Sequence, residues 1–258
     1  MKNFASLLKN GFWAIVALMT INSCSKESTN AGMGQLNIGA KSIASSTSTS
    51  GKIAMGEATL NSDVTITDFR MNLKEFELEM DNEYEDDDDD NDNEQWDDDG
   101  YFDFEDEIEL EGPFELDLLS GQISFISIEV PNGVYEELEF KFDESTDANS
   151  DLFGKSVLIE GTVKGTPFIF WHNFEDEVEV DFEDPLFDIT VENNANGLVI
   201  YFDLSLIFNT TSGVDLSQAT DGNADGVIEI SPMDEDGNNA LAQSIRNSIK
   251  AATDLLDD

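Results

Sequence analysis

The sequence is poor in the residues that most often form cross-links and catalytic centres. Among its 258 residues there is one cysteine, Cys24, and one histidine, His172. A single thiol cannot form an intrachain disulfide, and a single imidazole argues against a zinc site with several histidine ligands. A Ser-His-Asp triad would have to use His172, yet the chain has no Gly-x-Ser-x-Gly turn. Because phenylalanines flank His172 at strand spacing, we interpret it as a core residue and expect a protein that is not an enzyme.

Basic residues are scarce as well. The chain has 12 Lys and Arg against 57 Asp and Glu, a formal net charge of −45. Such a charge repels nucleic acid and anionic membrane surfaces, so we exclude both as binding partners. Residues 81–111 alone hold 19 acidic residues and no basic one. Within them, residues 82–100 are expected to form a solvated acidic hairpin loop, with a low-affinity store of divalent cations as the alternative.

Apolar runs are short. The run at residues 11–21 is too short for a membrane-spanning helix of about 20 residues and is typical of a signal peptide, here residues 1–23. It ends in Ile21-Asn22-Ser23-Cys24, which resembles the lipobox of bacterial lipoproteins. The resemblance implies cleavage before Cys24 and lipid attachment to its thiol. Since Ser25 rather than Asp follows, it also implies the outer membrane, with the protein facing the periplasm or the cell exterior.

Residues 24–50 are rich in Ser, Thr, Gly and Asn. A segment of this composition buries too little apolar surface to fold alone, so we predict a flexible tether, although residues 37–40 could belong to a first short strand. The folded domain is then expected over residues 51–258.

Most of this domain alternates apolar and polar residues with the period of a β-strand. Proline and glycine separate the alternating runs, so we predict an all-β fold, an antiparallel β-sandwich. The alternation shifts by one residue between Leu73 and Phe76, which predicts a β-bulge near residues 74–75. The segment at residues 166–174 is apolar on both faces, which indicates a central strand.

The C-terminus departs from the strand pattern. Apolar residues recur at helical spacing from Leu241 to Leu256, so we predict an amphipathic helix over residues 240–255. Asn238 or Asn239 would cap it. The helix is expected to pack on the sandwich, and a partner-binding helix is the alternative.

Several expected strands carry a carboxylate on every second residue, opposite their apolar residues. The set comprises Glu107, Glu109, Glu111, Glu137, Glu139, Glu177, Glu179, Asp181 and Glu183. If two such strands are neighbours, like charges face each other at a cost of about 0.2–1 kcal/mol per close pair. We interpret these residues as a solvated sheet face, and a face that counter-ions stabilise is the alternative.

A family resemblance lies in the middle of the chain. Residues 114–121 read FELDLLSG, and residues 130–140 read VPNGVYEELEF. Together they resemble a bacterial lipoprotein family of unknown function with a prealbumin-like β-sandwich, over about residues 55–210. The family's N-terminal Thr-Asp-Ala-Pro motif is absent. The resemblance implies a fold and no catalytic residues.

Residues 221–229 resemble the first nine positions of an EF-hand or dockerin calcium loop, with Gly226 at the sharp turn. Calcium takes six to eight oxygen ligands. The expected ligands are Asp221, Asn223, Asp225, the carbonyl of Val227, Glu229 and Asp234. Position twelve, usually a bidentate carboxylate, is Pro232, so Asp234 or Asp236 would have to swing back to complete the shell. A plain turn without metal is the alternative.

These features together predict a non-enzymatic, lipid-anchored envelope protein. It would be a structural or binding module with a calcium-stabilised loop and a protein or glycan partner. One alternative is a carbohydrate-binding or adhesive module that uses Trp96 and Tyr101. Another is a glycan-active hydrolase, because carboxylate pairs are abundant.

Overall fold

The computed structural model describes residues 33–43, 58–60, 63–80, 107–120, 123–181, 189–192, 195–208 and 213–253. These residues belong to one unit, residues 31–258. Strands make up most of it, in two sheets. None of the helices in the described ranges combines the length and apolarity that a membrane crossing needs.

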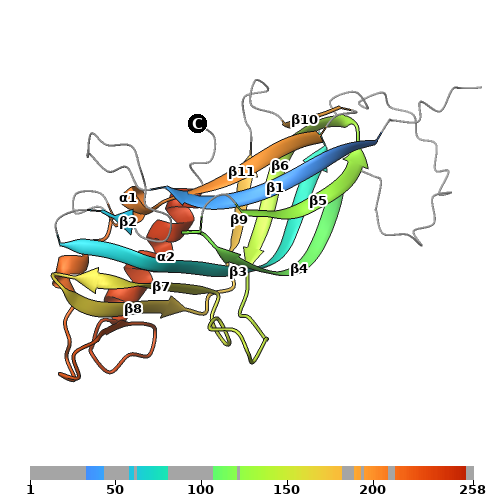
Figure 1. The fold of residues 1–258 in the computed structure, drawn as a ribbon. Helices are drawn as coiled ribbons and strands as arrows, with labels where there is room; N and C mark the ends of the chain where they lie inside the picture. The colour runs from blue at the N-terminus through green and yellow to red at the C-terminus, as the bar shows by residue number, and fades with distance from the viewer. Residues whose placement is uncertain are drawn as a thin grey trace, which may run out of the picture. The chain divides into compact units, whose positions relative to one another are not determined.

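The smaller sheet has β1 (Met33–Ile43) at its centre. It pairs with β5 (Ile123–Pro131) in antiparallel and with β11 (Ala195–Asp203) in parallel orientation, and Figure 1 shows β1 running between them. Leu36, Ile38 and Ala40 of β1 are fully buried. The prediction of a tether over residues 24–50 is therefore wrong for residues 33–43.

The larger sheet is built on one long strand, β3 (Val64–Met80). Its first half pairs with β7 (Val157–Val163), which continues to β8 (Thr166–His172) and β12 (Ile228–Ile230). Its second half lies between β4 (Glu107–Asp117) and β6 (Gly133–Phe142). The remaining strands are β9 (Glu177–Asp181) and β10 (Ile189–Val191), which pair with β6, and β2 (Ala58–Thr59), which pairs with β3.

The two sheets pack through phenylalanine side chains. Phe202 of β11 meets Phe69 of β3 and Phe140 of β6 edge-on, at ring-centroid distances of 6.2 and 6.4 Å. The predicted all-β sandwich is thus confirmed. Its sheets are mixed rather than purely antiparallel, because β1 pairs with β11, and β8 with β12, in parallel.

The predicted bulge is also confirmed. The register of β3 shifts between Leu73 and Glu75 against both β4 and β6. One extra residue, Lys74, returns the next apolar side chains to the inner face, and Phe76 and Leu78 are fully buried. All glutamates of the second half of β3 therefore share the outer face.

Helices are short and sit at the end of the unit that holds β7 and β8 (Figure 1). They are α1 (Leu204–Ile207), a 3-10 turn (Leu216–Gln218) and α2 (Asn239–Thr253). The last confirms the helix predicted over residues 240–255, as far as the described residues extend. Ala242, Ile245 and Ile249 face the core and are fully buried.

Truncating Phe76 to alanine should cost about 3–5 kcal/mol of unfolding free energy, because its buried ring contacts Phe114, Phe125 and Phe140. Urea unfolding of the soluble domain measures this loss. Phe153 is 57% exposed, so Phe153→Ala should change stability by no more than about 0.5 kcal/mol. Equal losses in the two variants would contradict this core.

Candidate functional site

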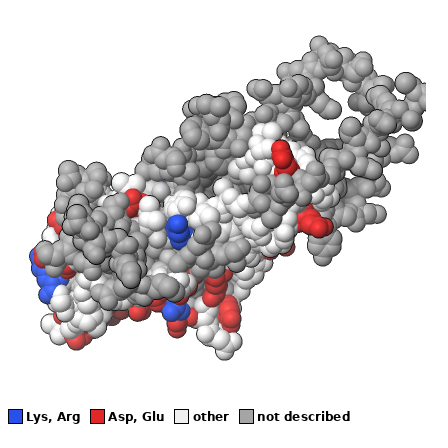
Figure 2. Space-filling view, turned by 45° about the horizontal axis from the view of Figure 1, so that its top comes forward, with Lys and Arg blue, Asp and Glu red and all other residues white. Residues whose placement is uncertain are grey.

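The outer side of β4, β3, β6 and β9 carries rows of carboxylates that run across the strands. We call it the acidic face. One row is Glu109, Glu77, Glu139 and Glu179, and the row beside it is Glu111, Glu75, Lys141 and Glu177. A further row contains Glu79 and Glu137. The neighbouring strands thus bring together those predicted carboxylates that the structure describes. Figure 2 shows few Lys and Arg on the face of the molecule that it draws.

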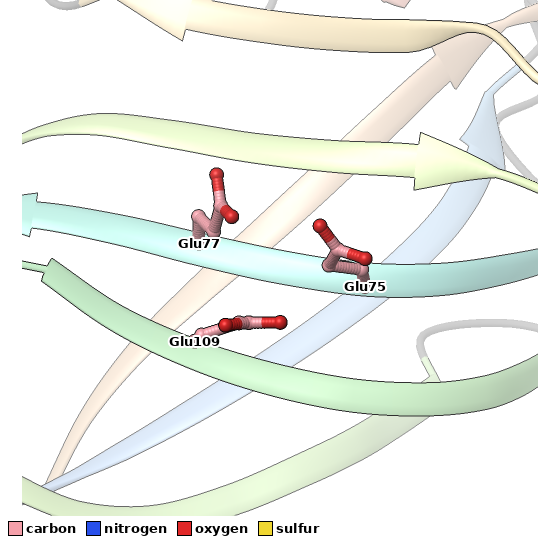
Figure 3. Close-up of side chains that lie close together, drawn as sticks. All are labelled: Glu75, Glu77 and Glu109. Atoms are coloured by element: carbon pink, nitrogen blue, oxygen red, sulfur yellow. The ribbon is translucent and has the colours of Figure 1, made fainter. Parts of the chain in front are cut away.

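Three carboxylates of the acidic face form a group on β3 and β4. Oxygens of Glu75, Glu77 and Glu109 all lie within 4.8 Å of one another, as Figure 3 shows. A cleft of about 150 Å³ beside them is lined by Glu77, Glu79, Glu137 and Glu139. Oxygens at this spacing concentrate cations, but the arrangement does not by itself select calcium.

Lys141 is the one basic residue within these rows. Its Nζ lies 2.8 Å from Glu177 Oε2 and 4.0 Å from Glu75 Oε1, and the hydrogen bond to Glu177 raises its pKa. Burial, followed by the charge of Glu177, raises the pKa of Glu139, while Lys141 opposes the rise. The carboxyl of Glu139 therefore holds its proton to a higher pH than an ordinary glutamate, whereas the hydrogen bond from Lys141 lowers the pKa of Glu177.

The predicted calcium loop closes on itself through its own side chains. The backbone N–H of Asp225 donates to Asp221 Oδ1 (3.1 Å) and to Asn223 Oδ1 (2.9 Å). The N–H of Gly226 donates to Asp221 Oδ2 and that of Val227 to Asp225 Oδ1, both at 2.9 Å. These bonds hold the side-chain oxygens of positions one, three and five (Asp221, Asn223 and Asp225) against the backbone of the same loop.

The structure distinguishes between the two carboxylates that could complete the loop. Asp236 is buried, and it accepts the N–H of Asn223 at Oδ1 (3.0 Å) and that of Glu229 at Oδ2 (2.7 Å). Asp234 instead accepts the N–H groups of Ser231, Gly237 and Asn238 in its own turn. Asp236 rather than Asp234 therefore lies against positions three and nine.

Glycine is required at position two of the loop. A Cβ on Gly222 would lie 2.3 Å from the carbonyl oxygen of Asp236. The backbone of Asp236 therefore passes directly over Gly222. At position six, Gly226 has φ +96°, in the left-handed region that favours glycine.

The donor set of the loop suits a hard cation, since every candidate ligand is an oxygen. Burial is the largest cause that raises the pKa of Glu229. The negative charges of Asp236, Asp225, Asp234 and Glu235 raise it further. Within the part of the chain that the structure describes, no Lys or Arg forms an ion pair with these acids. The carboxylates of this loop are more widely spaced than those of Glu75, Glu77 and Glu109. A bound ion would therefore draw them closer together.

Asn238 connects this loop to α2. Its buried amide donates to the carbonyls of Thr220 (2.8 Å) and Glu229 (2.7 Å) and accepts the N–H of Thr220 (3.1 Å). Its own carbonyl accepts the N–H of Ala242 in the first turn of α2. The side chain predicted to cap the helix thus ties the loop together instead. The sequence pattern offered Asp236 beside Asp234 as a closing ligand and Asn238 as a helix cap, but no local pattern indicates the contacts of Asn238 with Thr220 and Glu229.

His172 is 6% exposed and packs edge-on against Phe174, with ring centroids 5.2 Å apart. Its interpretation as a core histidine is confirmed. Cys24, the acidic loop at residues 82–100, Trp96 and Tyr101 lie outside the described residues.

No family model, curated protein or solved structure matches the chain. The resemblance to a lipoprotein family of unknown function stays a prediction.

Glu139→Gln should stabilise the protein at pH 7. The pKa of Glu139 is raised in the folded state, so its favourable contribution is present below its ordinary pKa of 4.5 and is lost as pH rises through the folded value. Neutralising it should relieve about 0.2–1 kcal/mol for each close pair. Thermal unfolding at pH 7 and pH 4 should show the gain only at pH 7.

Glu129→Gln on β5 is the matched control, because Glu129 pairs across the strands with uncharged Gln35. It should leave the melting temperature unchanged at both pH values. Added salt should shrink the gain from Glu139→Gln by screening. A gain that persists at pH 4 would show that charge is not its cause.

Proposed function

We propose that this protein is a lipid-anchored component of a bacterial outer membrane, facing the periplasm or the cell exterior. It acts there without catalysis, as a structural or binding module that a calcium-bound loop stabilises. The observation that carries the calcium part is the closure of residues 221–229 by Asp236. The lipobox-like segment ending at Cys24 carries the anchor.

The start of β1 gives the anchor a physical consequence. Only residues 25–32 separate Cys24 from Met33, where β1 begins. Eight residues reach at most about 30 Å when fully extended. A lipid on Cys24 would therefore hold the central strand of the smaller sheet close to the membrane, which suits a module that works at that surface.

Calcium would be held by Asp221, Asn223, Asp225, Val227 and Glu229, with Asp236 in the closing role. The ion supplies positive charge to carboxylates that have no basic partner among the described residues. The loop leads from the 3-10 turn into β12, and the segment that carries Asp236 joins β12 to α2. Binding would therefore stabilise the attachment of the helix as well as the loop.

The distribution of acidic side chains favours a binding module over a glycan hydrolase. The carboxylates of the acidic face sit on the outer side of the larger sheet, and the described residues that line the cleft there are all glutamates. Glycan hydrolysis instead needs two carboxylates on opposite sides of one sugar ring. The carbohydrate-binding alternative depends on Trp96 and Tyr101.

Calcium should raise the melting temperature of the soluble domain relative to chelator. The expected gain is about 2.7 kcal/mol when free calcium is 100-fold above its Kd. Differential scanning calorimetry in calcium, magnesium and chelator measures it. Asp225→Ala should remove the gain, and a melting temperature indifferent to calcium in the wild-type domain would overturn the site.

Three further variants separate the ligands from the turns. Asp147 also accepts a backbone N–H in a short turn, that of Asn149, so Asp147→Ala should keep the full response to calcium. Asp236→Asn should reduce the response. Asp234→Asn should lower stability equally with and without calcium, because Asp234 supports its own turn.

Cys24→Ala should abolish incorporation of labelled palmitate in a bacterial host and release the protein from the membrane fraction. Ser25→Asp, by contrast, should keep the lipid but change the membrane that holds the protein, because Asp after the lipidated cysteine departs from the outer-membrane pattern. Unchanged labelling of Cys24→Ala would exclude the anchor and leave the calcium proposal standing.

A further inference from the structure

His172 lies where α2 meets the larger sheet. It is the last residue of β8, and its side chain is buried beneath the helix. Its Nε2 faces the side-chain amide nitrogen of Gln243 in α2 at 3.0 Å. The carbonyl of His172 accepts the N–H of Ser156, just before β7. His172 thus contacts the sheet through its backbone carbonyl and the helix through its imidazole.

The hydrogen bonds of the ring determine its protonation. The backbone N–H of Asn173 donates to Nδ1 of His172 at 2.9 Å, so Nδ1 is an acceptor and carries no proton. The neutral ring must then carry its proton on Nε2, where the amide of Gln243 accepts it once its oxygen is turned toward the ring. A second proton has to enter at Nδ1, and there it would break the bond from Asn173.

Charges of both signs surround the ring, and they act on a second proton in opposite directions. Arg246 of α2 lies over the ring of Phe174 and pairs with Asp176, which follows β8. Lys250 of α2 lies 3.9 Å from the same carboxylate, and Glu144 accepts the side-chain amide of Asn173. Burial is the main cause that lowers the pKa of His172, Arg246 adds to it, and Asp176 opposes both.

We propose that the contact between α2 and β8 is an acid-sensitive latch, which protonation of His172 loosens while the two sheets stay packed. Only the neutral ring satisfies its neighbours in the closed state. The apolar side of α2, with Ala242, Ile245 and Ile249, keeps the helix mostly docked. Acid therefore raises the frequency of local opening and exposes this side transiently. The proposal depends neither on the lipid anchor nor on calcium.

The direction of the effect follows from the lowered pKa. The stabilising contribution of neutral His172 is complete above its ordinary pKa of 6.5 and is lost as pH falls from there toward the folded value. One linked proton changes the opening equilibrium by at most about tenfold per pH unit. Between pH 7.5 and 5.5 we expect α2 to open several-fold more often.

Hydrogen exchange at pH 7.5 and 5.5, corrected for intrinsic rates, tests the latch on the soluble domain. Amides of α2 should lose several-fold protection at the lower pH, and amides of β3 should not. His172→Gln keeps a side-chain amide at the contact but cannot titrate near neutral pH, so α2 in this variant should not respond to pH. An equal response in His172→Gln, or an equal loss in β3, would overturn the proposal.

A titration of the wild-type domain requires no substitution. His172 is the only histidine in the chain, so its imidazole signals in NMR spectra are unambiguous once any histidine tag is removed. Their midpoint should lie below 6.5, and Arg246→Gln should move it upward by removing the neighbouring cation. A midpoint at or above 6.5 in the wild-type domain would also overturn the latch.

Discussion

The alternation of apolar residues and glutamates along the second half of β3 is the constraint on which the larger sheet depends. Phe76 and Leu78 point into the core, and Glu75, Glu77 and Glu79 point away from it. Without the extra residue at Lys74, the pairing register would slip by one and reverse these faces. The bulge thus keeps one continuous apolar face while β3 changes partner from β7 to β6.

Apolar burial outweighs charge repulsion in this arrangement. A fully buried phenylalanine contributes about 1.5–3 kcal/mol, whereas a facing pair of like charges costs about 0.2–1 kcal/mol. Phe76, Phe140 and Phe142 are each at most 1% exposed on the inner side of the strands that carry the glutamates. The burial of the core beneath the acidic face therefore offsets the repulsion between its carboxylates. Lys141 reduces part of this repulsion. The free-energy cost of the acidic face depends on pH and salt, whereas the stabilising contribution of the core does not.

Period and spacing predicted the elements whose apolar residues follow a regular pattern. This group contains β3 with its bulge, β8 and α2, because each of these elements has a continuous apolar face. β1 does not, because Gly34, Gly39 and Ser42 give it the composition of a linker. It is a strand because β5 and β11 supply hydrogen bonds on both sides, which is a tertiary effect on β-propensity. Its parallel pairing with β11 joins residues far apart in sequence, so no local pattern indicates it.

The proposed calcium loop, residues 221–229, shows the same limit on a smaller scale. Positions one to nine follow a fixed spacing, so the sequence identified Asp221, Asn223 and Asp225. The closing carboxylate depends on the path of the backbone beyond Pro232. The extra turn that Asp234 organises brings Asp236 back over Gly222. A motif that assumes a helix after the loop places the last ligand at position twelve and misses this path.

The position of α2 follows from these two sites together. At its N-terminus, Asn238 ties the helix to a loop of carboxylates. One turn further, Gln243 and Arg246 meet His172 and Asp176. Both polar attachments depend on charge, whereas the strands beneath are held by aromatic packing that is indifferent to protons and ions. Free energies of local opening differ across a structure in this way. If both proposals hold, the attachment of the helix responds more to solution conditions than the packing of the sandwich.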